Sequence, residues 1–378
     1  MKLLFWIAFF GIIYTYGGYF LLLAVITAFK REKTCGITPL PSVSLIIAAY
    51  NEEAAIGRKL EESLKLDYPK DKLEIIVASD ASTDRTDGIV KRFAQRGVVL
   101  VRQDKRKGKT ATQNMAVDKA RGEILVFSDA TTCYKKDAVK KLVRNFGDAQ
   151  VGMVGGEEVF LEDVSGRMLE EVSLSWDYEK TLRRLEGKFG TLIGVSGCIF
   201  AIRRELYEKL DENLIENFAL PLRVIEKGYK VGLEKEAIGY EKTAAKSKDE
   251  FKRKARIVSG GINVLFRMRR LLNPLRYPKV AFQLISHKVF RWLTPVFLVG
   301  LFISNSFLLN ESLFFRIFFL VQTTCYLLAI GGVAVRGSNT YVKILKIPFY
   351  FCLVNLAVIA GIFKFLFRDN KVIWEPVR

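Results

Sequence analysis

The sequence VSLIIAAYNE (residues 43–52) begins with seven apolar or small residues and ends in three polar ones. Its first seven residues lack the three- and four-residue spacing of apolar side chains that indicates an amphipathic helix. A short continuous run of this kind is typical of a strand that is buried on both faces of a sheet. We therefore predict a strand over residues 43–49, with polar side chains directly after its end.

Similar runs recur through the first half of the chain, and helix-like stretches separate them. Further strands are predicted over residues 73–79, 98–101, 123–128 and 152–155. Helices are predicted over residues 53–66, 83–95, 110–120 and 135–146. Strands and helices in alternation predict an α/β fold with a mainly parallel, Rossmann-like sheet and right-handed crossovers.

Acidic residues follow three of these strands, at the edge of the sheet where ligands bind in such folds. Glu52 follows the first strand, Asp80 the second and Asp129 the fourth. A single acid at this place is usually a helix cap. Acids after both the second and the fourth strand also suit a divalent cation or a pair of ribose hydroxyls, because both need oxygen ligands at a fixed point.

A basic loop, KRKGKT (residues 105–110), follows the third strand and enters the same edge. A phosphate-binding P-loop would need a glycine where Gln103 stands, and no G-x-G-x-x-G follows the first strand. Two interpretations remain for the loop: a solvated charged surface, or a site for a diphosphate held together with a metal.

Four uncharged runs are long enough, or nearly so, to cross a membrane, which takes about 20 helical residues. They cover residues 3–29, 292–310, 317–335 and 347–363. The first is longer than the apolar part of a signal peptide, and no A-x-A cleavage pattern follows it. Basic residues after the last run leave two possibilities for that run, a full crossing or a re-entrant or interfacial placement.

The net charge of +19 is concentrated near the membrane, because residues 241–291 hold 14 Lys or Arg and only 3 Asp or Glu. The positive-inside rule then predicts a catalytic domain in the cytoplasm, attached to the inner or plasma membrane. This distribution, without a platform of aromatic and basic residues, argues against nucleic acid as a partner. A single histidine and five separated cysteines exclude histidine-based triads and disulfide scaffolds, and argue against zinc sites.

The predicted organisation has five parts. They are an N-terminal transmembrane helix (1–32), the α/β domain (40–240), a basic amphipathic interfacial segment (241–291), C-terminal transmembrane helices (292–366) and a basic tail (367–378).

Three segments of the α/β domain resemble motifs of the family 2 glycosyltransferases. They are PSVSLIIAAYNEE (41–53), LEIIVASDASTDRT (73–86) and RGEILVFSDA (121–130), in this order. Together with the flanking apolar runs they resemble the membrane-anchored branch that includes cellulose and hyaluronan synthases. The resemblance implies a GT-A fold, a nucleotide-sugar donor, a divalent metal (Mg²⁺ or Mn²⁺) and inversion at the transferred sugar. It also implies a lipid-linked or glycan acceptor and a role in cell-envelope or exopolysaccharide synthesis.

The resemblance also implies roles for individual residues. On the donor side these are Tyr50, Glu52, Asp80, Lys109, Asn114 and Asp129, of which Asp129 also binds the metal. Thr131 stands where the family has a second metal-binding acid. Metal affinity is then weaker, or the diphosphate and a hydroxyl complete the coordination shell.

On the acceptor side the resemblance implies Ser196, Gly197 and Cys198, the catalytic pair Glu216 and Asn217, and Arg256 for the leaving diphosphate. The acceptor-side segment also reads as a tight turn that enters a core strand. Asn217 occupies the position of the family's catalytic base, and an amide cannot take up a proton there. Three alternatives remain: Glu216 replaces it, Asn217 disables the enzyme, or the asparagine is an introduced change that traps a substrate complex. The alternative function is therefore a nucleotide-sugar-binding protein without catalysis that acts as an assembly or regulatory partner.

Overall fold

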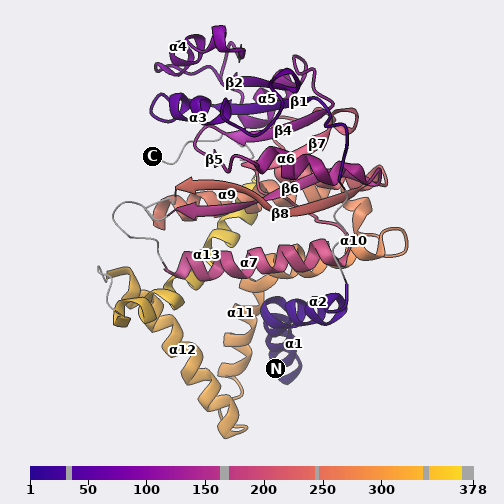
Figure 1. Cartoon of the computed structure of the whole chain (residues 1–378). Coiled ribbons are helices and arrows are strands. Elements are labelled where there is room, and N and C mark those ends of the chain that lie inside the picture. The colour runs from indigo at the N-terminus through magenta and orange to yellow at the C-terminus, as the bar shows by residue number, and fades with distance from the viewer. Residues whose placement is uncertain (31–35, 162–169, 243–246, 335–339, 368–378) are drawn as a thin grey trace.

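One mixed sheet of eight strands forms the centre of the protein in a computed structural model, which describes residues 1–30, 36–161, 170–242, 247–334 and 340–367 (Figure 1). The strand order is β3-β2-β1-β4-β7-β6-β8-β5. The strands are β1 (Val43–Ala49), β2 (Leu73–Ser79), β3 (Val98–Arg102), β4 (Ile124–Asp129), β5 (Cys133–Tyr134), β6 (Val151–Leu161), β7 (Ile199–Arg203) and β8 (Lys230–Lys242).

The first half of the sheet is parallel, as predicted. β1 lies between β2 and β4, and Ala49 pairs with Ser79 while Ala48 pairs with Asp129. This register brings the ends of the three strands to the same edge. The helices between them are α3 (Ile56–Ser63), α4 (Thr86–Lys91), α5 (Lys109–Val117) and α6 (Ala138–Arg144).

Both faces of this half are buried, which explains the continuous apolar runs. Ile46 packs into one core cluster with Phe127, whereas Leu45 and Ile47 pack into a second cluster on the opposite face. Fully burying such a side chain contributes roughly 1.5–3 kcal/mol. Successive side chains of the run 43–49 point to opposite faces of the sheet, and because both faces are buried, the run is apolar almost throughout.

The second half of the sheet is mixed. β7 is antiparallel to both β4 and β6, while β6 and β8 are parallel and long, with an irregular register between Gly156 and Glu157. The prediction gave β6 only its first residues and did not include β8. Local periodicity carries little information on such strands, because their partners lie far away in the sequence.

Helix α7 (Glu170–Phe189) lies between the sheet and the apolar helices (Figure 1). Toward the sheet, its Lys180 and Arg184 form ion pairs of 2.6 and 2.8 Å with Glu157 of β6. Toward the apolar helices, Glu186 accepts a 2.8 Å hydrogen bond from the hydroxyl of Tyr19 and lies 2.8 Å from Nδ1 of His287. Helix α7 therefore connects the two parts of the protein.

Four helical stretches of the described chain are long and apolar enough to cross a membrane: Lys2–Thr27, Pro278–Ser306, Leu313–Gly332 and Lys346–Leu366. They comprise α1 (Lys2–Ile13), η1 (Tyr14–Gly18) and α2 (Tyr19–Thr27), then α10 (Pro278–Gln283), η7 (Leu284–Val289) and α11 (Phe290–Ser306), then α12 (Leu313–Ala334) and α13 (Thr340–Leu366). The second stretch begins earlier than its predicted apolar run, at residue 278 rather than 292. Pro278 at the first helical turn favours this start, and the polar residues that follow, such as His287, pack against the catalytic part of the protein.

Contacts between these helices are close. A side chain at Gly11 would collide with the ring of Phe297 at 2.8 Å, so α1 and α11 approach closely there. Lys2 and Glu311 form a 2.8 Å ion pair that ties the start of α1 to the turn before α12. Helix α13 instead packs on α9 (Ser247–Arg267), where Gly361 meets Val258. The last apolar run thus reaches the catalytic part of the protein, and residues 368–378 of the predicted tail lie outside the described residues.

Candidate functional site

Asp80, at the end of β2, organises the basic loop. Its side chain is buried, and its two oxygens accept hydrogen bonds from the backbone N–H groups of Lys107 (2.8 Å) and Gly108 (2.9 Å). Gly108 has a φ of 91°, a conformation that favours glycine, and it precedes the first residue of α5. The loop is thereby fixed against the edge of the sheet.

Segments 50–53 and 80–86 are joined by several hydrogen bonds beside this loop. The backbone N–H of the buried Glu52 donates to the hydroxyl of Thr86 at 2.8 Å. The guanidinium of Arg106 lies 3.9 Å from the ring centre of Tyr50, a cation–π contact. Tyr50, Glu52 and Asp80, which were predicted as donor-side residues, therefore lie in one connected region.

Lys109 forms the centre of the site. Its Nζ lies 2.6 Å from Oδ1 of Asp129 and 3.0 Å from Oε1 of Glu216, and it donates a 3.1 Å hydrogen bond to the carbonyl of Gly197. Burial opposes the charge of Lys109, but the two carboxylates outweigh it and raise the pKa of the lysine. The structure thus joins a donor-side residue, the predicted metal ligand and the predicted catalytic segment around one ammonium group.

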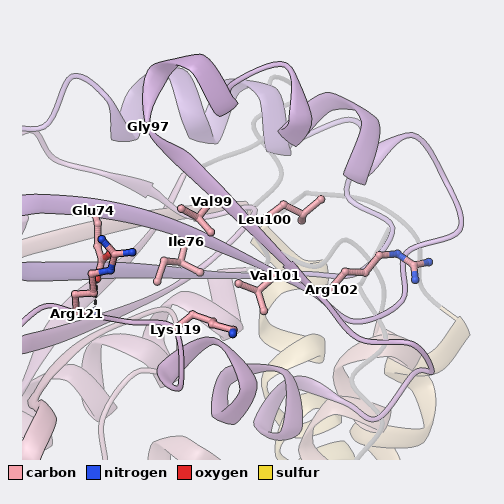
Figure 2. Close-up of a pocket in the computed structure, with 9 residues that line it drawn as sticks. All are labelled: Glu74, Ile76, Gly97, Val99, Leu100, Val101, Arg102, Lys119 and Arg121. Atoms are coloured by element: carbon pink, nitrogen blue, oxygen red, sulfur yellow. Dashed lines mark hydrogen bonds between the residues drawn. The ribbon is translucent and has the colours of Figure 1, made fainter.

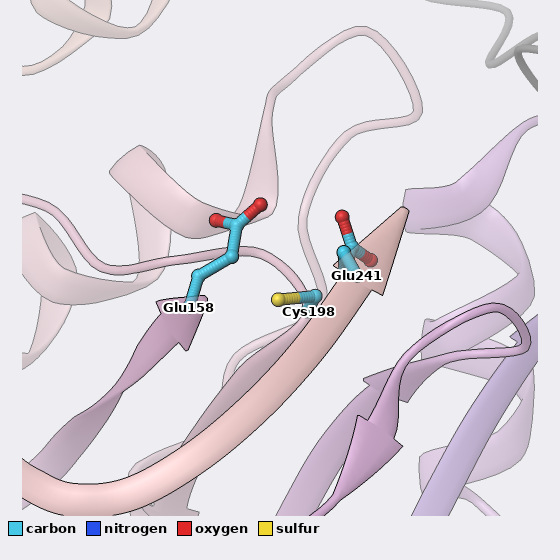
Figure 3. A group of neighbouring side chains, drawn as sticks. All are labelled: Glu158, Cys198 and Glu241. Carbon is cyan, nitrogen blue, oxygen red and sulfur yellow. The ribbon is translucent and has the colours of Figure 1, made fainter. Parts of the chain in front are cut away.

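Further carboxylates meet beside Asp129. Glu158 of β6 and Glu241 of β8 lie with the thiol of Cys198 in a group whose potential ligand atoms are within 4.8 Å of one another (Figure 3). Ser196 donates a 2.6 Å hydrogen bond to Glu158. We call Asp129, Glu158 and Glu241 the carboxylate cluster.

The acidic groups of the carboxylate cluster repel one another, which disfavours their ionised forms. Burial, together with the charges of Glu158 and Asp129, raises the pKa of Glu241 to about 8. Burial also raises the pKa of Asp129, although Lys109 opposes this shift. Hard oxygen ligands with unbalanced negative charge fit a divalent cation such as Mn²⁺ or Mg²⁺.

Asn217 lies at the start of α8 (Glu216–Glu226), next to the small residues predicted for the acceptor side. A side chain at Gly197 would lie 3.5 Å from each of Nδ2 of Asn217, Oε1 of Glu216 and Nζ of Lys109. The backbone carbonyl of Asn217 accepts a 2.9 Å hydrogen bond from Val195. The backbone of Gly197 is therefore packed between α8 and Lys109, with just enough room for a Cβ atom in ordinary van der Waals contact.

Two other predicted residues lie farther from this centre. The amide of Asn114 donates to the carbonyl of Leu210 at 2.7 Å, while its oxygen accepts hydrogen bonds from the hydroxyl of Tyr207 at 2.9 Å and from the backbone of Leu210 at 3.2 Å. These contacts make Asn114 an anchor of the 207–210 segment. Arg256 lies on α9, one turn before Gly260, which packs on Ile215 directly before α8.

A hollow on the outer edge of the sheet is separate from this site (Figure 2). Val99, Val101 and Arg102 of β3 line it, with Lys119 and Arg121 from the end of α5. None of the residues that line it belongs to the centre around Lys109.

Comparison with known proteins identifies the domain that carries these residues. Residues 44–211 match the family model described as Glycosyl transferase family 2. This part of the chain is therefore similar to a glycosyltransferase family 2 domain.

Relatives of this domain include enzymes of glycolipid synthesis. "Probable glycosyltransferase YdaM" of Bacillus subtilis (strain 168) is 29% identical over 282 residues, which cover 71% of this chain and 66% of that protein. "Beta-monoglucosyldiacylglycerol synthase" of Synechocystis sp. is 34% identical over 118 residues, 30% of this chain and 25% of that protein. The chain thus spans less than two thirds of these relatives.

A solved structure shares the fold of the whole described chain. "Mannosyltransferase PcManGT from Pyrobaculum calidifontis in complex with GDP-Man and Mn2+" has a TM-score of 0.73 at 22% identity, and the alignment covers 97% of this chain and 99% of that one. The predicted GT-A fold is confirmed.

The sheet also carries two candidate site residues that the sequence prediction missed. Glu158 and Glu241 stand near the carboxyl ends of β6 and β8, the same kind of position that drew attention to Asp80 and Asp129. An acid near the end of a strand was again the indication, but it could be recognised only once the full extents of β6 and β8 were known.

Proposed function

We propose that this protein is a membrane-integral, inverting glycosyltransferase of the cellulose- and hyaluronan-synthase-like branch. It transfers a sugar from a nucleotide-sugar donor to a lipid-linked or polysaccharide acceptor, in cell-envelope or exopolysaccharide synthesis. The observation that carries the proposal is the meeting of Lys109 with Asp129 and Glu216, beside the carboxylate cluster, at the ligand-binding edge of a family 2 domain.

The donor side of the site provides for a nucleotide and for its diphosphate. Tyr50 and Glu52 would lie against the nucleoside, near the loop that Asp80 fixes. Asp129, Glu158 and Glu241 would hold a divalent cation, which when bound neutralises diphosphate charge and so makes the nucleoside diphosphate a better leaving group. Arg256 would add a guanidinium suited to phosphate oxygens.

The chemical step needs a base for the acceptor hydroxyl. The hydroxyl oxygen attacks the anomeric carbon, the bond from that carbon to the diphosphate breaks, and the hydroxyl proton must leave. Asn217 has no suitable basic atom. Glu216 is the neighbouring carboxylate, and because Lys109 contacts its Oε1, we assign the proton to Oε2.

The apolar helices and the basic residues around α9 support attachment to the membrane. The positive-inside rule then favours a cytoplasmic catalytic domain, where nucleotide sugars would reach it. An acceptor in the membrane would approach from the side of α8 and α9.

The experiment is release of nucleoside diphosphate by the detergent-purified full chain with Mg²⁺ or Mn²⁺. GDP-mannose is the first donor to test, because a mannosyltransferase in complex with it shares the fold, and UDP-glucose is the second, because of the glucosyldiacylglycerol synthase relative. We expect Glu216→Gln to lower the rate by about 10²- to 10⁴-fold, the usual contribution of a general base. Glu212→Gln, at a half-exposed position just before α8, is the matched control.

The variant Asn217→Asp distinguishes a glycosyltransferase from a nucleotide-sugar-binding protein without catalysis. Activity of the natural chain that depends on Glu216 supports the proposal as written. Activity only in Asn217→Asp would show an intact donor site disabled by the amide. Binding of the donor without turnover in either protein would support the alternative, a nucleotide-sugar-binding partner protein.

A further inference from the structure

Four basic side chains gather where α7, α9 and η7 meet, near the start of α8. Arg183 of α7 and Arg253 of α9 both lie over the ring of Trp176, at 5.9 and 5.7 Å from its centre. Lys254 of α9 and Lys288 of η7 are close enough for their charges to repel, and Arg183 also repels Lys288. We call Arg183, Arg253, Lys254 and Lys288 the basic pocket.

The carboxylates near the basic pocket are already occupied. Glu250 lies 2.8 Å from Arg253 and 3.8 Å from Lys254, and it accepts a hydrogen bond from Tyr350. Glu186, the other acid whose charge acts on Lys288, is bonded to Tyr19 and His287.

Arg183 and Lys288 form no ion pair with any residue that the structure describes. The four cations therefore face three carboxylates, Glu250, Glu186 and Glu158, each of which has other partners. Burial lowers the pKa of Lys254, as do the charges of Arg253 and Lys288, although Glu250 opposes them. Burying like charges together costs free energy, and a bound anion would remove that cost.

The position of the basic pocket indicates which anion. The ammonium group of Lys288 lies 5.5 Å from the ring centre of Phe218, and Phe218 directly follows Asn217 on α8. Lys288 also belongs to the apolar stretch Pro278–Ser306, near the end that meets the catalytic domain. An anion held here would lie both at the membrane surface and beside the proposed acceptor side of the site.

We propose that the basic pocket binds the phosphate group of a lipid-linked acceptor and so holds the acceptor hydroxyl next to Glu216 and Asn217. This inference rests on the proposed function and specifies its acceptor as a lipid phosphate or diphosphate. Arg183 and Arg253 present planar guanidinium groups that match phosphate oxygens, while the two lysines add point charges. The same chemistry would also recognise the phosphate of a bulk phospholipid headgroup, and the test separates these two sources.

The test measures binding of farnesyl phosphate to the full chain in a non-ionic detergent by microscale thermophoresis, without any donor. We expect farnesyl phosphate to bind and farnesol not to bind. Lys288→Gln and Arg183→Gln should each raise the dissociation constant about tenfold, the usual effect of losing one charge-assisted contact. Lys288→Arg should restore binding, and Lys252→Gln, at an exposed position of α9, should leave it unchanged.

Three outcomes would overturn the inference. One is equal binding of farnesol, which would indicate only an apolar groove. Another is equally strong competition by phosphatidylglycerol, which would indicate a site for bulk headgroups. The third is unchanged affinity in both glutamine variants with thermal midpoints like that of the natural chain.

Because binding is measured without donor or turnover, its failure leaves release of nucleoside diphosphate as an independent test of the proposed function. Conversely, a chain that binds farnesyl phosphate through Lys288 but releases no nucleoside diphosphate would refute the enzyme and not the phosphate site.

Discussion

The carboxylate cluster and the basic pocket carry opposite charges on the two sides of the start of α8. In the first, Glu158 and Glu241 lie close together, and Asp129, which Lys109 contacts, interacts electrostatically with both. In the second, four cations share Glu250, Glu186 and, through Arg253, Glu158 of the first region. Each region contains like charges that the chain itself does not neutralise. The comparison teaches that crowded like charges indicate the charge of the ligand that would stabilise them: a cation for the carboxylate cluster and an anion for the basic pocket.

The largest effect is expected in the carboxylate cluster, from Asp129→Asn. This change removes the proposed metal ligand that also contacts Lys109, and it should lower release of nucleoside diphosphate by about three orders of magnitude. Asp104→Asn, at an exposed position of the loop after β3, is the control. Unchanged activity in Asp129→Asn would refute the assignment of the site.

Lys109→Met tests whether the ammonium group of Lys109 is required for the stability of the carboxylate cluster. The change leaves Asp129 and Glu216 without their shared counter-ion, and breaking a buried pair of this kind costs about 3–5 kcal/mol. We expect a clear fall of the thermal midpoint in metal-free buffer, measured by differential scanning fluorimetry, and a partial recovery with Mn²⁺. Lys105→Met, in the exposed part of the loop, should change little; an equal fall in both variants would contradict the argument.

Glu241→Gln should separate stability from metal binding. Because the pKa of Glu241 is about 8, its carboxyl is largely protonated at pH 7 without metal, and a neutral amide replaces it at little cost. We expect the metal-free stability to change by less than about 0.5 kcal/mol, while the dissociation constant for Mn²⁺ rises about 10- to 100-fold. Isothermal titration calorimetry measures the second effect. Glu236→Gln on the same strand is the control, and equal Mn²⁺ affinity in the two variants would remove Glu241 from the metal site.

The smallest effect is expected in the basic pocket, from Lys254→Met. A lysine whose pKa is lowered in the folded state costs stability while it is charged, and this cost disappears as the pH rises through the lowered pKa toward the ordinary value of about 10.4. The thermal midpoint of the natural chain should therefore rise relative to that of Lys254→Met over this alkaline range. Parallel pH profiles of the two proteins would show that Lys254 is not under this repulsion.

The difference between the two halves of the sheet explains how much of the fold the sequence could predict. β1 to β4 are parallel, buried on both faces and separated by helices, so each of them is a short apolar run with a polar end. β7 inserts antiparallel between β4 and β6, and β6 and β8 continue past an irregular register. Their pairing depends on residues far apart in the chain, which local periodicity does not report.

The same difference explains the candidate site. Asp80, Lys109 and Asp129 follow regular strands or begin a helix, so the sequence could name them as candidates. Glu158 and Glu241 lie in the irregular half, and it missed them. Asn114 has a side chain suited to a ligand, but Tyr207 and Leu210 occupy its polar atoms. Only the tertiary structure distinguishes an anchor of this kind from a residue that faces a ligand.

Glu157 and Glu158 are consecutive residues of β6, yet their side chains contact different parts of the protein. Glu157 is held by Lys180 and Arg184 of α7, and Glu158 by Ser196 in the carboxylate cluster. Glu186 of α7 also contacts Tyr19 and His287. A chain of polar contacts therefore runs from the apolar helices through α7 to Glu157, the residue next to Glu158. A tilt of the apolar helices that displaces α7 would pull on Glu157 and, through a single peptide bond, shift Glu158. For a membrane-spanning protein that binds metal as proposed above, the thickness of the bilayer would therefore alter the position of Glu158 and the affinity of the proposed metal site.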